Sequence, residues 1–476
     1  MDMDHWPGQE VLVVGLGSSG RAASRLLRLL EAHVTAIDGA ATDDLRREAA
    51  VLAGEGIRAL VGTQELPVGD FVAAVVSPGV PPGIPVMRAI RQRGIPVISE
   101  LELGWRQVAG PMVAITGTNG KTTTTELVAR ICEHAGLKAI AAGNIGLPLC
   151  EVARRRETWD YLAVEASSFQ LEAIDQFQPA VALLMNLTPD HLDRYDSLED
   201  YFRAKGRIFK SQTPDQWAVV QWEAHQVLRD LGIPIAAQVI TFSARADAAD
   251  LFLDEGVIRS RWPGWPGPLL SLQQARLQGA HNVENMMAAL GAALVLRLPL
   301  AAAVQALCSY QPAPHRCERV AEFGGVQFVN DSKATNVDAV RQALLAMPAP
   351  EDGRANLWLI AGGKDKGFSY GELGPVLASR VRGAFVLGET ARRICGEWQR
   401  FTPCTSVKSL LEAVDKAGRQ ARQGDVILLS PACSSFDMFQ NYQHRGEMFR
   451  QAVLDWIRQR TRCPQEIGAG AGEVRP

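Results

Sequence analysis

The sequence predicts an α/β protein of three domains. Short apolar runs that read as strands alternate with amphipathic stretches that read as helices, and two boundary-like segments divide this pattern into three parts. The length of 476 residues fits roughly three domains, each large enough to bury its own core. Hydrophobic residues make up 47% and charged residues 21% of the chain, which excludes a largely disordered or fibrous protein.

Charge and apolar patterning exclude further classes of protein. Lys and Arg number 49 and Asp and Glu 52, so the net charge of −3 argues against a nucleic-acid binder that works by bulk charge. The acidic start has no basic region followed by an apolar one, so no signal peptide is expected. Arg297 and Pro299 interrupt the longest apolar stretch, residues 288–304, which predicts a buried helix and no membrane span. The eight scattered cysteines, without a CxxC pair, are expected to be free thiols.

The N-terminal part, residues 1–103, is expected to form a Rossmann-like domain. Apolar strand-like runs alternate with a helix-like stretch and a loop rich in proline and glycine. The expected elements are strands at 11–14, 33–38 and 95–99, a helix at about 20–30, and a loop at 77–83.

A glycine motif follows the first of these strands. Gly15, Gly17 and Gly20 come directly after it, and Asp38 ends the next strand. This spacing is typical of a dinucleotide-binding fingerprint, which places a diphosphate at a helix N-terminus. The motif predicts NAD or another nucleotide-type ligand, and a tight strand–helix turn without a ligand is the alternative.

The central part, residues 104–312, is expected to be a P-loop-type ATPase domain with a mostly parallel sheet. A strand leads into a glycine loop and then into a helix for which Gly136 is a suitable stop. Further elements are expected as strands at 161–165 and 181–186 and a helix at about 282–298.

The glycine loop, residues 115–122 (ITGTNGKT), carries the sharpest chemical signal. Its glycines allow backbone amides to surround phosphate oxygens, Lys121 would reach the β- and γ-phosphates, and Thr122 would ligate Mg²⁺. The strict GxxxxGK[ST] pattern fails, because Ile115 stands at the first glycine position and the extra glycine is Gly117. We therefore predict a variant P-loop, with an ordinary strand–helix turn as the alternative.

Metal-capable side chains follow two of the strands expected in the central part. Glu165 ends one strand and His191 comes just after another. Because parallel strands present their C-terminal ends at one sheet edge, both are expected near the glycine loop, where they could hold Mg²⁺ beside a triphosphate. Lys205, judged from its local sequence alone, is expected to be a solvated helix lysine.

The C-terminal part, residues 313–476, is expected to be a second Rossmann-like domain, with a disordered tail beyond residue 462. Strands are expected at 326–331, 356–361, 384–388 and 426–430. Lysines and hydroxyls gathered at one sheet edge favour a small anionic substrate such as a carboxylate. They lie in the segments 331–336, 362–366 and 430–436, which contain Lys333, Thr335, Lys364, Lys366 and Ser435.

An ATP site, a second diphosphate site and a site for a small anion together predict a ligase that couples ATP cleavage to the joining of two substrates. An NAD-dependent oxidoreductase would explain the N-terminal glycines but not the P-loop-like turn. A nucleotide-binding regulator would keep the P-loop but would not need Glu165, His191 and the C-terminal lysines.

The sequence resembles the ATP-dependent Mur ligases of peptidoglycan synthesis over nearly its whole length. The motifs in the central part would also fit sister ligases and the folylpolyglutamate synthases. The motifs at 330–336 and 430–439, with the run SPGV at 77–80, indicate the members that add D-glutamate. Residues 211–275 match no motif. The shared motifs are 117–123 (GTNGKTT), 143–148 (GNIGLP), 165–172 (EASSFQLE), 186–195 (NLTPDHLDRY), 281–285 (HNVEN), 314–316 (PHR), 330–336 (NDSKATN) and 430–439 (SPACSSFDMF).

The resemblance implies that the N-terminal domain holds UDP rather than NAD, and it assigns three sets of binding residues. The residues implied for the UDP-linked substrate are Gly17, Ser18, Ser19, Asp38, Ser77, Gly79, Asn144, Ser167, Gln170 and His191. Those implied for ATP are Gly117, Thr118, Asn119, Gly120, Lys121, Thr122, Thr123, Asn282, Arg316 and Asp331. Those implied for D-glutamate are Lys333, Thr335, Lys366, Ser435 and Phe436.

The implied reaction adds D-glutamate to UDP-N-acetylmuramoyl-L-alanine through an acyl phosphate and yields ADP and phosphate. The implied catalytic residues are Lys121, Glu165, His191 and Lys205. Two Mg²⁺ ions are expected, one on Thr122 and Glu165 and one near His191. The resemblance also implies that CO₂ carbamylates Lys205, whose carbamate would help to hold the second metal.

The expected partners are small molecules, with no nucleic acid and no membrane. The protein is expected to be a monomer. The bacterial cytoplasm is expected from the missing targeting signal and from the family's soluble nucleotide substrates.

Overall fold

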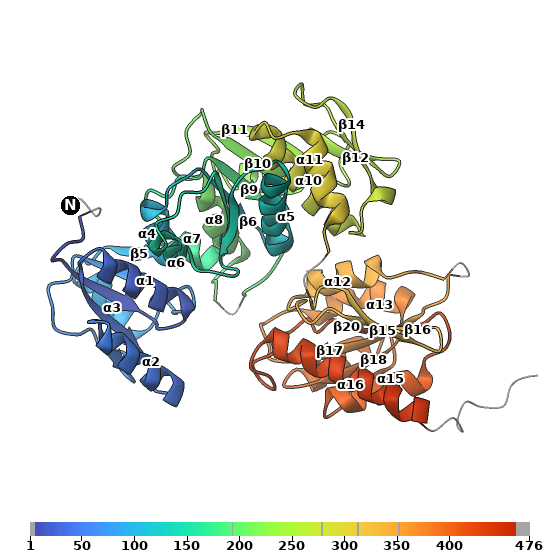
Figure 1. Ribbon diagram of the computed structural model, residues 1–476. Helices are drawn as coiled ribbons and strands as arrows, with labels where there is room; N and C mark the ends of the chain where they lie inside the picture. Colours follow the sequence, from blue (N-terminus) through green and yellow to red (C-terminus); the bar gives the residue numbers. More distant parts are fainter. Residues whose placement is uncertain (1–4, 193, 278, 312–313, 351–352, 463–476) are drawn as a thin grey trace, which may run out of the picture. The chain divides into compact units, whose positions relative to one another are not determined.

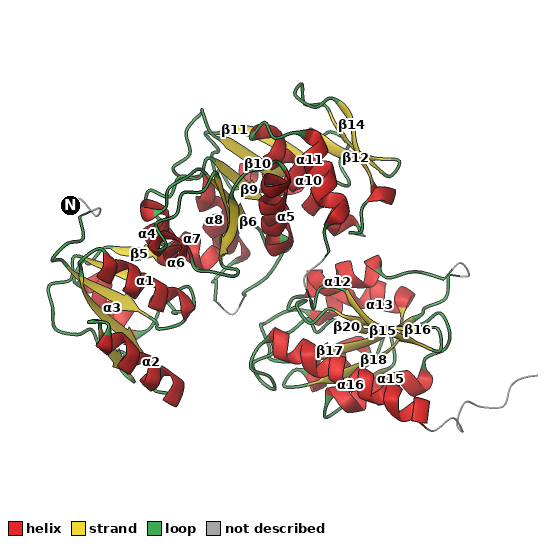
Figure 2. Cartoon of the chain, in the orientation of Figure 1, coloured by secondary structure: helices red, strands yellow, loops and turns green. Residues whose placement is uncertain are grey.

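The computed structural model of the protein describes residues 5–462, apart from 193, 278, 312–313 and 351–352. Its fold is α/β, with three separate and mostly parallel sheets, as expected (Figure 2). The chain divides into two compact units. One comprises Met1–Pro189 and Arg194–Gln311, and the other comprises Asp190–Asp193 and Pro312–Pro476. The expected boundaries at 103/104 and 312/313 stay predictions, and the expected disordered tail lies outside the described residues.

The N-terminal sheet, drawn in blue in Figure 1, is parallel and has the strand order β3-β2-β1-β4-β5. The order reverses between β1 and β4, and ligands bind at such a switch point because the adjoining loops diverge there. The strands are β1 Glu10–Val14, β2 His33–Asp38, β3 Arg58–Val61, β4 Ala73–Val76 and β5 Val97–Ser99. The helices are α1 Ser18–Leu29, α2 Asp43–Gly54, α3 Pro85–Gln92 and α4 Glu100–Gln107.

The central sheet has the strand order β14-β13-β12-β11-β10-β9-β6-β8-β7 and is parallel from β7 to β12. Two antiparallel pairings, β12 with β13 and β13 with β14, complete it. The strands are β6 Met112–Thr116, β7 Ala139–Gly143, β8 Tyr161–Glu165, β9 Val181–Leu184, β10 Trp217–Gln221, β11 Gln238–Ser243, β12 Leu251–Asp254, β13 Val257–Ser260 and β14 Gly267–Ser271.

Helices cover both faces of this sheet. One face packs against α5 Lys121–His134, α10 Ala280–Val295 and α11 Leu300–Ser309. The buried helix expected at about 282–298 is confirmed as α10, which ends before Arg297, a residue with φ +57°, and Pro299 then precedes the first residue of α11. Within the described part of the chain, no helix is long and apolar enough to cross a membrane. The remaining helices are α6 Leu149–Arg154, α7 Ser168–Glu172, α8 Leu198–Gly206, η1 Arg207–Phe209, α9 Trp222–Asp230 and η2 Leu272–Gln274.

The C-terminal sheet has the order β15-β16-β20-β17-β18-β19, with only its edge strand β15 antiparallel. Helices α12–α14 pack on one face and α15 and α16 on the other, so β17 is buried throughout. The strands are β15 Glu318–Phe323, β16 Val326–Asn330, β17 Leu357–Gly362, β18 Val381–Leu387, β19 Cys404–Ser406 and β20 Val426–Leu429. The helices are α12 Val337–Ala346, η3 Tyr370–Leu373, α13 Gly374–Arg380, α14 Ala391–Trp398, α15 Leu410–Gln420 and α16 Tyr442–Arg462.

Four of the described cysteines are buried, and the other three are partly exposed. All seven of these described cysteines are free thiols, as expected. The Sγ atoms of Cys395 and Cys404 lie 2.9 Å apart.

Candidate active site

The loop between β6 and α5 has the backbone of a phosphate-binding turn. Gly117 has φ +148° and Gly120 has φ +84°, and added Cβ atoms would meet the Cβ of Met185 and the Oδ1 of Asn285. Only glycine fits both positions without strain. The loop therefore opens into the N-terminus of α5, whose first residue is Lys121, and can present backbone amides to an anion.

Asn186, which follows β9, holds this loop in place. Its Oδ1 accepts hydrogen bonds from the backbone N–H groups of Thr118 (3.1 Å) and Asn119 (2.8 Å), and its Nδ2 donates to the carbonyl of Asn119. Lys121 Nζ donates to the carbonyls of Gly117 (3.0 Å) and Thr118 (2.9 Å), so the lysine lies along the loop. No role was expected for Asn186, although it is the first residue of the run 186–195 that is shared with the Mur ligases.

The two residues expected to hold one Mg²⁺ are in contact. Thr122 Oγ1 donates to Glu165 Oε2 over 2.7 Å, and Asn144 Nδ2 donates to Glu165 Oε1 over 2.8 Å. Glu165 is buried at the end of β8. A hydroxyl and a carboxylate at this spacing are oxygen ligands of the kind Mg²⁺ prefers, so these residues fit such an ion.

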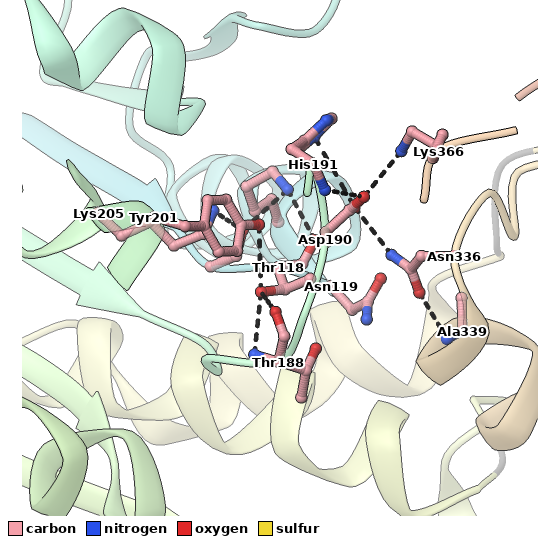
Figure 3. A network of polar contacts seen from close by, with 12 residues as sticks. Thr118, Asn119, Thr188, Asp190, His191, Tyr201, Lys205, Asn336, Ala339 and Lys366 are labelled. Atoms are coloured by element: carbon pink, nitrogen blue, oxygen red, sulfur yellow. Dashed lines mark hydrogen bonds and ion pairs between the residues drawn. The ribbon is translucent and has the colours of Figure 1, made fainter. Parts of the chain in front are cut away.

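Lys205 on α8 is not the solvated lysine expected from its local sequence. Its side chain is buried, its Nζ donates to the carbonyl of Gly117 over 2.8 Å, and it lies 4.5 Å from the centre of the Tyr201 ring. Tyr201 in turn donates to Thr118 Oγ1, which donates to the carbonyl of Thr188 (Figure 3). The structure thus brings Lys205 to the glycine loop, and its carbamylation and its role in holding a metal stay predictions.

A second site lies at the switch point of the N-terminal sheet. A cavity of about 630 Å³ is lined mainly by the loops that follow β1, β2, β3 and β4 and by the loop 143–148. The carboxylate of Asp38 accepts hydrogen bonds from the backbone N–H groups of Leu16 and Ala40, which holds the loops after β1 and β2 at the edge of this cavity. Seven of the residues expected for the UDP-linked substrate line it: Gly17, Ser18, Ser19, Asp38, Ser77, Gly79 and Asn144.

Ser167 and Gln170, also expected for this substrate, form the capping box of α7 instead of lining the cavity. Ser167 Oγ accepts the N–H of Gln170, and Gln170 Oε1 accepts the N–H of Ser167. Their roles in substrate binding stay predictions.

His191 belongs to the second unit, whereas Glu165 and Lys205 belong to the first. It has φ +54°, and its backbone N–H donates to Asp190 Oδ1. Asp190 is buried and makes an ion pair of 2.8 Å with Lys366. Burial alone would raise the pKa of Asp190, but the charges of Lys366 and His191 lower it to about 2.

Polar side chains expected for ATP and D-glutamate lie on loops at the carboxyl edge of the C-terminal sheet. Asp331 is buried and accepts hydrogen bonds from Ser430 Oγ (2.9 Å) and the N–H of Cys317 (3.2 Å). Burial raises its pKa to about 7. Lys333 Nζ lies 4.2 Å from the centre of the Tyr442 ring. The sequence analysis assigned no role to Tyr442, which opens α16.

The loops after β17 and β20 are neighbours, since Lys364 N–H donates to the carbonyl of Ser434. Ser435, on the second of these loops, is buried, and Phe436 is 69% exposed. Thr335 is partly buried near the start of α12. The structure thus places the expected D-glutamate residues at one edge of this sheet.

Arg445 on α16 ties these loops together and was missed by the sequence analysis. It is 1% exposed, and its guanidinium donates to the carbonyls of Ser332 (2.8 Å) and Cys433 (3.1 Å) and to Ser332 Oγ (3.0 Å). Burial lowers its pKa to about 10. No local pattern singled it out, because one of its two partners, Ser332, lies 113 residues away in the chain.

Two other expected ATP residues lie next to groups already described. Asn282, in the first turn of α10, accepts a hydrogen bond from Asn285, whose Oδ1 faces Gly120. Arg316 is close enough to Asp331 for its charge to lower that residue's pKa. Asn285 was not singled out from the sequence.

Comparison with known proteins identifies the class. Residues 115–293 match the Mur ligase middle domain, and residues 315–433 match the family described as Mur ligase, glutamate ligase domain. The chain belongs to the Mur ligase family. It is 41% identical to the UDP-N-acetylmuramoylalanine–D-glutamate ligase of Acidobacterium capsulatum, covering 94% of this chain and 96% of the relative. The ligase of that name from Geobacter metallireducens is 42% identical, with 94% and 97% covered.

Solved structures share the fold. MurF from Acinetobacter baumannii superposes with a TM-score of 0.61 at 17% identity, covering 93% of each chain. UDP-N-acetylmuramate-alanine ligase from Thermotoga maritima gives 0.59 at 18% identity, covering 94% of this chain and 99% of that one. The family and the three-domain α/β fold class expected from the sequence are confirmed.

Proposed function

We propose that this chain uses ATP to join D-glutamate to UDP-N-acetylmuramoyl-L-alanine, with ADP and phosphate as the other products, in the synthesis of peptidoglycan precursors. The contact between Thr122 and Glu165 beside the loop that carries Lys121 is the observation that carries the proposal. It unites a phosphate-binding turn with a carboxylate in a family whose relatives bear this ligase name.

The first step activates a carboxylate. The terminal alanine carboxylate of the UDP-linked substrate attacks the γ-phosphate of ATP, ADP leaves, and an acyl phosphate forms. Both reacting groups are anionic, so their approach requires positive charge and hydrogen-bond donors. Lys121 and the amides of the glycine loop would supply these, while Thr122 and Glu165 would hold Mg²⁺, which would offset charge on the phosphates.

The second step forms the amide bond. The amine of D-glutamate attacks the acyl phosphate carbon, and phosphate leaves from a tetrahedral intermediate. Lys366, Lys333 and Ser435 would bind the carboxylates of the amino acid through charge-assisted bonds and a hydroxyl. His191 and a carbamylated Lys205 would hold a second Mg²⁺.

The substrates would occupy the cavities and loops described above. The N-terminal cavity would hold the UDP moiety, with its diphosphate at the start of α1. Asn282, Arg316 and Asp331 would contact ATP. The protein would act as a monomer in the bacterial cytoplasm on small molecules alone.

Phosphate release from Mg-ATP tests the proposal. The purified chain is supplied with UDP-N-acetylmuramoyl-L-alanine and with D-glutamate, L-glutamate, L-alanine or a diamino acid. Release that requires D-glutamate, with a product heavier by one glutamyl residue, is the expected result. Release driven only by another amino acid would indicate a sister ligase. No release with any of them would refute the proposed ligase activity, and binding of a nicotinamide cofactor would then be the next measurement.

A further inference from the structure

Asp190 satisfies two donors that lie far from it in the chain. Its Oδ1 accepts from Lys366 Nζ over 2.8 Å, and its Oδ2 accepts from Asn336 Nδ2 over 3.1 Å (Figure 3). These partners are 176 and 146 residues away. Asp190 is 5% exposed. One ammonium and one amide donor on the two oxygens is a pattern by which proteins recognise a free carboxylate.

Asn336 is positioned without the help of Asp190. Asn336 caps α12, and its Oδ1 accepts the N–H of Ala339 over 2.8 Å, which turns Nδ2 toward Asp190. Asp365, next to Lys366 in sequence, is engaged elsewhere by Tyr370 and Arg393. The carboxylate that neutralises Lys366 is therefore the distant Asp190 and not its sequence neighbour.

We propose that Asp190 occupies the subsite of a substrate carboxylate, so that D-glutamate must displace it from Lys366 and Asn336 in order to bind. The inference rests on the proposed function, which assigns Lys366 to the amino-acid site. It adds that Asn336 is a second donor in that subsite and that the site carries its own competing carboxylate.

A competing role and a supporting role of Asp190 predict opposite effects of its removal on D-glutamate binding. If Asp190 only oriented Lys366, its removal would weaken D-glutamate binding. If Asp190 competes with D-glutamate, its removal strengthens binding, because the apparent dissociation constant is the intrinsic one divided by the fraction of sites that are open. The sign of the change therefore separates the two roles.

Calorimetric titration of D-glutamate into the full chain tests the proposal, with UDP-N-acetylmuramoyl-L-alanine and a non-hydrolysable ATP analogue present. Asp190→Ala is expected to lower the dissociation constant by at least about threefold. Asp190→Asn, which keeps the shape and removes the charge, is expected to lower it by less. The measurement needs no turnover, so a loss of kcat through the neighbouring His191 does not obscure it.

Two further variants complete the experiment. Asp415→Asn removes a carboxylate paired with Arg419 on the surface of α15 and is expected to leave the dissociation constant unchanged. Asn336→Ala, which removes the second donor, is expected to weaken binding several-fold. An unchanged or raised dissociation constant in both Asp190 variants would overturn the proposal while leaving the ligase assignment intact. A wild-type chain that neither binds D-glutamate nor turns it over would instead refute the proposed function.

Discussion

The buried surroundings of a positively charged residue decide what it can do, as Lys121 and Arg445 show. Lys121 and Arg445 both donate to backbone carbonyls of loops at the edge of a sheet. Lys121 is half-buried on a loop shaped for phosphate, so its ammonium can exchange carbonyls for phosphate oxygens. Arg445 is fully buried, so it has no such freedom and its contribution is to hold two loops together.

Lys121→Ala is expected to lower D-glutamate-dependent phosphate release by at least about 100-fold, because a positioned charge opposite the γ-phosphate is lost. Binding of UDP-N-acetylmuramoyl-L-alanine, measured by calorimetry, should survive because its cavity lies on other loops. Lys210→Ala, at an exposed lysine, is the matched control and should leave both quantities unchanged. An equal loss of release and of substrate binding would contradict the separation of the two sites.

Arg445→Ala is expected to lower the free energy of unfolding by about 3 kcal/mol, because it strands the buried carbonyls of Ser332 and Cys433. Urea unfolding followed by circular dichroism measures the change. Arg458→Ala, at an exposed position on the same helix, should change stability by no more than about 0.5 kcal/mol. Similar effects of the two substitutions would show that the buried hydrogen bonds matter little.

Elements that are defined by local sequence were predicted well. The strands at 33–38 and 161–165 have the bounds expected, because buried parallel strands are continuous apolar runs with polar ends. The five strands between Trp217 and Ser271 were not assigned. The short antiparallel strands among them, β12 to β14, are only partly buried, and their pairing depends on neighbours that local patterns do not reveal.

Gly120→Ala tests the loop between β6 and α5 as an element. Alanine at φ +84° costs about 1–2 kcal/mol in a left-handed backbone, and its Cβ would also collide with Asn285. We expect lower stability and a large loss of phosphate release. Gly136→Ala is the matched control, since Gly136 has φ +80° with open space around it, and should cost stability alone. Full activity in Gly120→Ala would contradict the tight turn.

Three buried carboxyl groups make the stability of the molecule depend on pH. Burial raises the pKa values of Glu100, Glu284 and Asp331 to about 7. Each is protonated more readily in the folded than in the unfolded chain. Their contribution to stability is therefore complete below the unfolded pKa, near 4, and is lost as the pH rises through about 7.

Glu100→Gln is expected to raise the melting temperature relative to wild type by a few degrees more at pH 8 than at pH 5. Glutamine imitates the neutral carboxyl group, which accepts the N–H of Cys150 and has a second buried oxygen without a hydrogen-bond partner among the described residues. Thermal unfolding across this range measures the effect. The exposed Glu65→Gln should show no such trend, and a pH-independent difference for Glu100→Gln would show that burial does not keep the carboxyl protonated.

The sequence by itself determined the α/β class, the glycine loop with Lys121, and the N-terminal glycine fingerprint. These features depend on residues close together in the chain, whose backbone preferences and apolar spacing act locally. Only the tertiary structure decided that Lys205 is buried against Gly117, that Asp190 pairs with Lys366, and that Arg445 joins two loops. Such contacts join residues about 90 to 180 positions apart, and what a buried charge meets depends on the packing of whole elements rather than on its neighbours in sequence.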